Sequence, residues 1–131
     1  MPSLFSRIIT RELPAYIVAE DEHHIAFLDI NPNALGHTLC VPKKEVDKLF
    51  DLSATAYQDL MMFSRGVAAA LKQVVSCKRI GLTVIGLEVP HVHVHLIPLN
   101  AMEDATFKKK VARSKEEMLN LTQQISAAFK Q

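Results

Sequence analysis

The five-residue stretch 91–95 has the sequence His-Val-His-Val-His, which is the strongest structural constraint in the chain. Side chains that alternate with a period of two are typical of a β-strand, because successive residues of a strand point to opposite faces of the sheet. The pattern therefore predicts a strand over 92–98. On that strand the imidazoles form a row on one face, spaced by about 7 Å, while the valines and Leu96 face the core from the other side.

A row of imidazoles suits nucleophilic and acid–base chemistry on phosphorus. The unperturbed pKa of imidazole is about 6.5, and its two ring nitrogens can carry out different tasks. The central His93 can attack a phosphoryl centre, while His91 and His95 hold the phosphoryl oxygens or protonate the leaving group. Such a reaction divides one difficult displacement into two easier steps through a covalent phosphoramidate.

Two other interpretations fit histidines at this spacing. Zinc accepts a His-x-His pair on a strand, but three ligands spread over two strand repeats cannot all reach one ion at about 2.1 Å without distortion. The imidazoles can also simply cover a solvated face of the sheet. Both alternatives stay open beside the phosphoryl chemistry.

The rest of the chain predicts further strands and two helices. Apolar residues at helical spacing predict one long helix that is capped by Ser53 and ends near Val75. Runs rich in β-formers between breakers predict four more strands, most simply in an antiparallel arrangement. These strands are expected at 16–19, 24–28, 37–41 and 79–86.

The final segment, about 100–131, is expected to be an extension that ends in a helix. Ser114 begins a capping-box pattern, and an apolar stripe predicts an amphipathic helix over 114–129. That stripe must be buried, either on the long helix or across a subunit interface. The lysines at 108–110 fit a solvated surface, although they can also attract an anionic substrate or partner.

Composition excludes several classes of protein. A chain of 131 residues, 49% of them hydrophobic, suffices for one globular domain, predicted here over 1–131. A formal net charge of +1 lacks the positive field of nonspecific nucleic-acid binding, so no nucleic-acid partner is expected. No apolar run is long enough for a membrane span, and the first residues lack a secretory signal, so we expect a cytoplasmic protein. Cys40 lies in an apolar run that favours a core position.

The segment 86–98 closely resembles the signature of the histidine triad family of nucleotide hydrolases and transferases. The resemblance implies an α+β fold with a five-stranded antiparallel sheet and one long helix, to which this chain adds a C-terminal helix. It also implies a homodimer in which the two sheets join. Roughly residues 4–99 share the likeness, in successive blocks of the small, single-domain branch at 5–9, 12–14, 20–21, 26–32, 36–39 and 41–43.

The same resemblance implies roles for individual residues. His93 matches the nucleophile that attacks the α-phosphate, and His91 and His95 match the flanking members of the triad. His37 matches a fourth histidine that faces the triad, and Asp29 matches a carboxylate that binds the ribose hydroxyls. The apolar pocket for the base is matched by Phe5, Ile8, Leu13, Phe27 and Ile30.

Each of these positions also has a purely structural interpretation. An aspartate at position 29 favours entry into the turn that follows it. A single histidine at a strand start, such as His37, can be structural, and the apolar residues of the implied pocket can be ordinary core.

Two departures from the family pattern concern metal binding and phosphate contacts. Many bacterial members bind a structural zinc through cysteines and a histidine at the places held here by Ser3, Ser6 and Glu45, so no metal or other cofactor is expected. Leu87 replaces a glutamine amide that contacts phosphate, and Leu99 replaces a frequent arginine. A loop ahead of Leu87 is also shortened, so phosphate contacts are expected to be few.

Nearby groups can substitute for the missing phosphate contacts. The candidates are backbone N–H groups near Glu88 and Val89, or the side chains of Glu88 and Asn100. The leading hypothesis is an enzyme that releases a nucleoside monophosphate, with a purine base, from an amide, acyl or polyphosphate conjugate through a nucleotidyl-histidine. The alternative is a nucleotide-binding module with little turnover.

Overall fold

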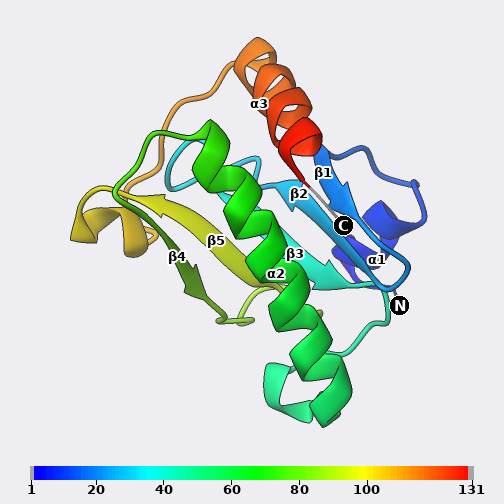
Figure 1. Ribbon diagram of the computed structural model, residues 1–131. Coiled ribbons are helices and arrows are strands. Elements are labelled where there is room, and N and C mark those ends of the chain that lie inside the picture. Colours follow the sequence, from blue (N-terminus) through cyan, green and yellow to red (C-terminus); the bar gives the residue numbers. More distant parts are fainter. Residues whose placement is uncertain (1, 130–131) are drawn as a thin grey trace.

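The computed structural model, shown in Figure 1, describes residues 2–129 around one antiparallel sheet with the strand order β1-β2-β3-β5-β4. The predicted α+β class, with five strands, a long helix and an added C-terminal helix, is confirmed, whereas the joining of two sheets in a homodimer stays a prediction. The elements are α1 (Leu4–Ile9), β1 (Ile17–Glu20), β2 (His24–Leu28), β3 (Thr38–Pro42), η1 (Leu49–Asp51), α2 (Ala54–Val74), β4 (Arg79–Thr83), β5 (Val94–Leu99), η2 (Met102–Ala105) and α3 (Lys115–Ala128).

The strand that follows the histidines is shorter than predicted. Its ladder with β3 begins at Val94, and ahead of that point the Val92 N–H donates to the Val46 carbonyl at 2.7 Å instead of to a strand. His91 and His93 therefore lie on the segment that leads into β5 and not within the strand. The alternation of faces continues through this segment, because Val92 is buried in the same cluster as Val94.

Small shifts affect the other strands as well. β1 and β3 begin and end one residue later than predicted, and β2 has the predicted bounds. β4 ends at Thr83 rather than Gly86. Gly86 has a φ of +75°, a left-handed conformation that favours glycine, and the chain here has left the sheet.

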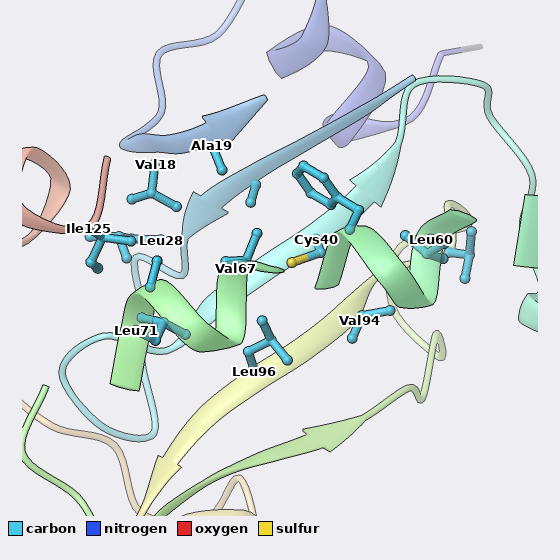
Figure 2. Close-up of a cluster of buried hydrophobic side chains, with 14 of the residues drawn as sticks. Val18, Ala19, Leu28, Cys40, Leu60, Val67, Leu71, Val94, Leu96 and Ile125 are labelled. Carbon is cyan, nitrogen blue, oxygen red and sulfur yellow. The ribbon is translucent and has the colours of Figure 1, made fainter. Parts of the chain in front are cut away.

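One face of the sheet is covered by α2 and α3. Ser53 caps α2, since its Oγ accepts the N–H of Ala56 at 3.1 Å. Figure 2 shows the apolar cluster beneath α2, in which Cys40 is buried as expected. This cluster includes Val18, Leu28, Cys40, Leu60, Val67, Leu71, Val94, Leu96 and Ile125.

The opposite face is covered by α1 and not by solvent. Phe5 and Ile8 of α1 pack on the alternate residues of β2 and β3, which are Ile25, Phe27, Leu39 and Val41. The histidines lie on this face, and they are buried there with exposed fractions of 0% for His91, 7% for His93 and 7% for His95. The interpretation of a solvated histidine face is therefore wrong, because a second layer closes over that side of the sheet.

The C-terminal helix packs on the long helix, as predicted for its apolar stripe. Met118 and Ile125 of α3 are buried in the cluster beneath α2, and the ring of Phe129 lies 5.8 Å from that of Phe63. Ser114 and Glu117 form the expected capping box at its start. Within residues 2–129, no helix is long and apolar enough to cross a membrane.

Candidate active site

A pocket of about 760 Å³ opens on the histidine side of the sheet. Its wall is mostly apolar, and it contains all the residues implied to bind the base together with Asp29 at one side. The expected residues that line it are Phe5, Ile8, Leu13, Phe27, Asp29, Ile30, Glu88, Val89, His93 and His95. The apolar residues serve as core and as pocket wall at once, because α1 packs on the sheet beside an open space.

His93 presents one defined ring nitrogen for chemistry. Its Nδ1 lies 2.8 Å from the backbone carbonyl of His91 and can only donate to that oxygen. In the neutral ring the proton is therefore on Nδ1, and Nε2 keeps an unprotonated lone pair. The ring is held edge-on against Phe5 at a centroid distance of 4.8 Å.

His95 and His37 form a chain of oriented imidazoles. The N–H of Asn33 donates to His37 Nδ1 at 3.0 Å, so the proton of neutral His37 is on Nε2. That Nε2–H donates to His95 Nδ1 at 3.0 Å, which leaves the proton of His95 on its Nε2. The ring centroids of His93 and His95 are 4.9 Å apart, so a ring with an Nε2 lone pair and a ring with an Nε2–H donor are neighbours at the pocket.

Burial keeps this chain neutral. It lowers the pKa of His37 to about 3, with His95 and Lys110 adding to the effect. Burial also lowers the pKa of His95 to about 4, and His93 and Lys110 contribute in the same direction. Both imidazoles are uncharged at neutral pH, so the tautomers set by the hydrogen bonds persist there.

His91 lies deeper and does not line the pocket. Its Nε2–H donates to the Pro42 carbonyl at 2.7 Å, and its Nδ1 accepts the hydroxyl proton of Ser3 at 2.7 Å. Burial lowers its pKa, which favours the neutral ring. The side chain of His91 is thus fixed on both sides, and its own carbonyl in turn orients His93.

The positions that resemble a zinc site do meet in space, but with other chemistry. Glu45 Oε1 accepts the Ser3 N–H at 2.6 Å and the Ser6 hydroxyl at 2.7 Å. These bonds, that of the Ser3 N–H first, lower the pKa of Glu45 to about 2. Two hydroxyls and a carboxylate beside an imidazole that already accepts a hydrogen bond do not fit zinc, which takes thiolate and free imidazole ligands in structural sites.

A second group of possible metal ligands is Asp29, His37 and His95, whose ligand atoms lie within 4.8 Å of one another. The facing nitrogens of the two histidines share a hydrogen bond, so neither offers a free lone pair to an ion. Burial raises the pKa of Asp29, and its Oδ1 accepts the Asn31 N–H at 2.8 Å. Asp29 therefore both shapes the turn and lines the pocket.

Asn100 does not line the pocket, so the structure gives no support to its expected role in phosphate binding. Its Oδ1 accepts the N–H of Lys78 at 3.0 Å, beside the start of β4. β5 leads away from the histidines, none of its residues after His95 lines the pocket, and Asn100 follows its last residue. Leu87, Glu88 and Val89 all line the pocket. Leu87 is 89% exposed there.

Three pocket residues from the C-terminal segment, Thr106, Phe107 and Lys110, were missed from the sequence. Phe107 packs edge-on against His95 at 4.9 Å, and Lys110 lines the pocket beside it. The lysine run offered a weak signal, since attraction of an anion was one of its two interpretations. No local pattern distinguishes Lys110 from Lys108 and Lys109, because the fold alone decides which of them reaches the pocket.

Comparison with known proteins identifies the class to which this fold and pocket belong. The model of the HIT domain matches residues 10–102, and the chain belongs to this histidine triad family. A HIT-like protein of Borreliella burgdorferi is 34% identical over 94% of this chain and 95% of its own length. Adenosine 5'-monophosphoramidase HNT1 of Saccharomyces cerevisiae is 36% identical over 72% of this chain and 61% of its own length.

Solved structures agree with this assignment. A histidine triad nucleotide-binding protein from Sulfolobus tokodaii has a TM-score of 0.81 at 31% identity, covering 95% of this chain and 90% of its own. A HIT-like protein from Bartonella henselae has a TM-score of 0.83 at 28% identity, covering 96% and 95% of the two chains. Both alignments extend well beyond residue 102 and so include the C-terminal segment.

Proposed function

We propose that the protein is a nucleotidyl hydrolase or transferase that cleaves at the α-phosphate of a nucleoside monophosphate conjugate. The observation that carries the proposal is the tautomer pattern: an Nε2 lone pair on His93 beside an Nε2–H donor on His95, at one end of an apolar pocket. The phosphoramidase activity named for the yeast relative supports the same chemistry.

The reaction proceeds through two displacements. His93 Nε2 attacks the α-phosphorus, and the bond from phosphorus to the leaving amine, carboxylate or phosphate breaks as the bond to nitrogen forms. The Nε2–H of the neutral His95 donates a hydrogen bond to the leaving group, which takes its proton from solvent water. The hydrogen bond from His93 Nδ1 to the His91 carbonyl strengthens as the ring becomes positive.

Water completes the cycle. It attacks phosphorus, the bond between phosphorus and His93 breaks, and the proton that the water loses returns to the solvent. His37 keeps its Nε2 proton toward His95 Nδ1, so that neutral His95 presents the same Nε2–H donor in both steps. A transferase reaction replaces the water by another acceptor.

The pocket supports a nucleoside as the part of the substrate that is held. Phe5, Ile8 and Phe27 offer an apolar wall against which a purine base can pack, in a pocket whose volume of about 760 Å³ lies in the range of small-molecule sites. Asp29 lies at the same pocket, where an ionised carboxylate can accept two ribose hydroxyl hydrogen bonds.

A homodimer is part of this proposal. β4 is an edge strand with free backbone groups along its outer side, and Leu82 on it is 52% exposed. Pairing with β4 of a second copy covers this edge and joins two sheets. Sedimentation at micromolar concentration should give twice 14.6 kDa; a monomer alone contradicts the dimer.

The experiment is turnover of an adenosine phosphoramidate that carries a fluorescent amine, with binding of adenosine monophosphate measured in parallel. Release of the amine supports the enzyme, whereas binding without release supports a nucleotide-binding module. The exposed apolar Leu87 at the pocket favours the second outcome, because it cannot hydrogen-bond the phosphate. Leu87→Gln restores an amide and should raise kcat/KM about tenfold if that lost contact limits the rate.

A further inference from the structure

The C-terminal segment folds back over the pocket after β5. The Val111 N–H donates to the Pro32 carbonyl at 3.1 Å, and Asn33 Nδ2 donates to the Asp104 carbonyl at 2.9 Å. We call residues 104–111 the strap. It joins the loop between β2 and β3, which carries Asp29 and leads to His37, although it lies beyond the residues matched by the HIT-domain model.

Asn33 is the point at which strap and histidines meet. It is 0% exposed, and its backbone N–H and both polar atoms of its side chain form hydrogen bonds. Its N–H donates to His37 Nδ1, its Nδ2 donates to the strap, and its Oδ1 accepts from Lys110 Nζ at 2.8 Å. The residue that sets the tautomer of His37 therefore also fixes the position of the Lys110 ammonium.

Phe107 supplies the second support for that ammonium. Lys110 Nζ lies 5.0 Å from the centre of the Phe107 ring, within cation–π range. The same ring packs edge-on against His95 at 4.9 Å and His37 at 5.9 Å. Phe107 has a φ of +64°, an unfavourable conformation for a bulky residue, so tertiary contacts hold it in this place.

The neighbouring lysines are directed elsewhere. Lys109 Nζ pairs with Glu103 at 3.3 Å, and neither Lys108 nor Lys109 lines the pocket. Lys110 is close enough to the site for its charge to add to the lowering of the pKa of His37 and His95 by burial and to oppose the rise in the pKa of Asp29. An ammonium has three N–H donors, and the one contact to Asn33 leaves donors for an anion.

We propose that Lys110 binds the phosphate of the ligand in this pocket, and that the strap thereby supplies the anion contact that Leu87 and Leu99 lack. The inference rests on the proposed function for the nature of the ligand, a nucleoside 5'-phosphate. It gives the extension beyond residue 102 a direct part in the site, with Phe107 and Asn33 as the positioning residues of Lys110.

The test compares a ligand that has the phosphate with one that lacks it. Calorimetry gives the Kd of adenosine monophosphate and of adenosine for the wild type, for Lys110→Met and for Lys108→Met, which removes the same charge outside the pocket. A hydrogen bond between charged groups corresponds to about a tenfold or larger change in affinity. We expect Lys110→Met to raise the Kd of the monophosphate by at least about tenfold and to leave that of adenosine within twofold.

Two additional measurements keep the test decisive. The Lys110→Met loss should shrink at high salt, and Lys110→Arg should retain most of the wild-type affinity. Equal losses in Lys110→Met and Lys108→Met, or equal losses for both ligands, overturn the proposal. If the wild type hydrolyses the phosphoramidate but Lys110→Met binds the monophosphate normally, the role of Lys110 is refuted and the proposed reaction is not. If Lys110→Met selectively loses monophosphate binding but the wild type shows no turnover, the proposed reaction is refuted and the role of Lys110 is not.

Discussion

The two ends of the histidine row are fixed by different segments of the chain and by different chemistry. At the His91 end, Ser3 at the start of α1 donates to the ring, and the exposed carboxylate of Glu45 holds that serine through its N–H. At the His95 end, the neutral His37 donates to the ring, and the buried Asn33 fixes His37 and the strap. The His91 end is thus held by a charged carboxylate that is exposed to water, whereas the His95 end is held by buried neutral groups.

The difference implies that the two ends of the histidine row serve different purposes, structural support at His91 and proton placement at His95. A carboxylate in water can hold a backbone and a hydroxyl without affecting proton transfer in the pocket. A buried chain of imidazoles transmits the choice of tautomer directly to a ring that lines the pocket. We therefore expect changes at the His91 end to alter stability and changes at the His95 end to alter rate.

The largest effect is expected at the centre of the row. His93→Ala removes the proposed nucleophile and should lower kcat by at least about a thousandfold, because no other group at the pocket carries a free ring nitrogen lone pair. Single-turnover release of the fluorescent amine is the measurement. The Kd of adenosine monophosphate should change much less. A variant with near-normal kcat would show that the covalent step does not occur.

The second effect concerns the C-terminal helix. This helix follows the strap in the sequence but does not line the pocket. Ile125→Ala leaves a cavity beneath α2, where Ile125 is fully buried, and should cost about 2 to 5 kcal/mol of unfolding free energy. Leu119→Ala, on the exposed side of α3, is the control. Urea titration measures both. A change in monophosphate affinity of folded Ile125→Ala would contradict the separation of helix and strap.

The third effect tests the buried chain. His37→Leu removes the donor to His95 and should lower kcat about tenfold or more while His95 changes from one tautomer to a mixture. Nitrogen chemical shifts of the imidazoles report the tautomers. His24→Leu is the matched control, since His24 is also buried but stacks on Phe63 away from the pocket. An unchanged His95 tautomer in His37→Leu would mean that His37 is only structural.

The same variant has a defined pH dependence. The pKa of folded His37 is lowered to about 3 from an ordinary value of 6.5, so the folded state resists protonation and loses stability as pH falls between those values. His37→Leu should therefore show a shallower loss of stability than the wild type over this window. Parallel curves for the two proteins would contradict the neutral, buried state of the ring.

The smallest effect is expected at the other end. Glu45→Gln should lower the melting temperature at pH 7 by a few degrees and change kcat less than about threefold. The pKa of Glu45 is lowered to about 2 from 4.5, so its stabilising contribution is present above pH 4.5 and is lost as pH falls toward 2. The difference in melting temperature between Glu45→Gln and the wild type should disappear as pH falls over that range. Glu22→Gln, which changes another exposed carboxylate, serves as the control. If Glu45→Gln lowered kcat as much as His37→Leu does, the expected difference between the two ends of the histidine row would be contradicted.

Much of the fold follows from local patterns. The period of two around the histidines, the apolar helical spacing after Ser53 and the capping box at Ser114 each depend on neighbours in sequence, and each gave the right kind of element. The bounds of β5 and β4 were less accurate because pairing with a distant strand decides where a ladder ends. The assignment of Asn100 to the pocket failed for a related reason: nearness in sequence to the triad does not mean nearness in space across a six-residue strand.

By itself the sequence determined which face each histidine takes, where the long helices begin and which family the chain resembles. Only the tertiary structure decided which ring nitrogen of His91 and of His95 carries the proton and which lysine reaches the pocket. A tautomer is fixed by its hydrogen-bond partner, and those partners lie 88 residues away for His91 and 58 for His95. Lys110 depends likewise on Asn33, 77 residues away. Periodicity is a property of neighbouring residues, whereas these contacts exist only after the sheet has brought both ends of the chain to one place.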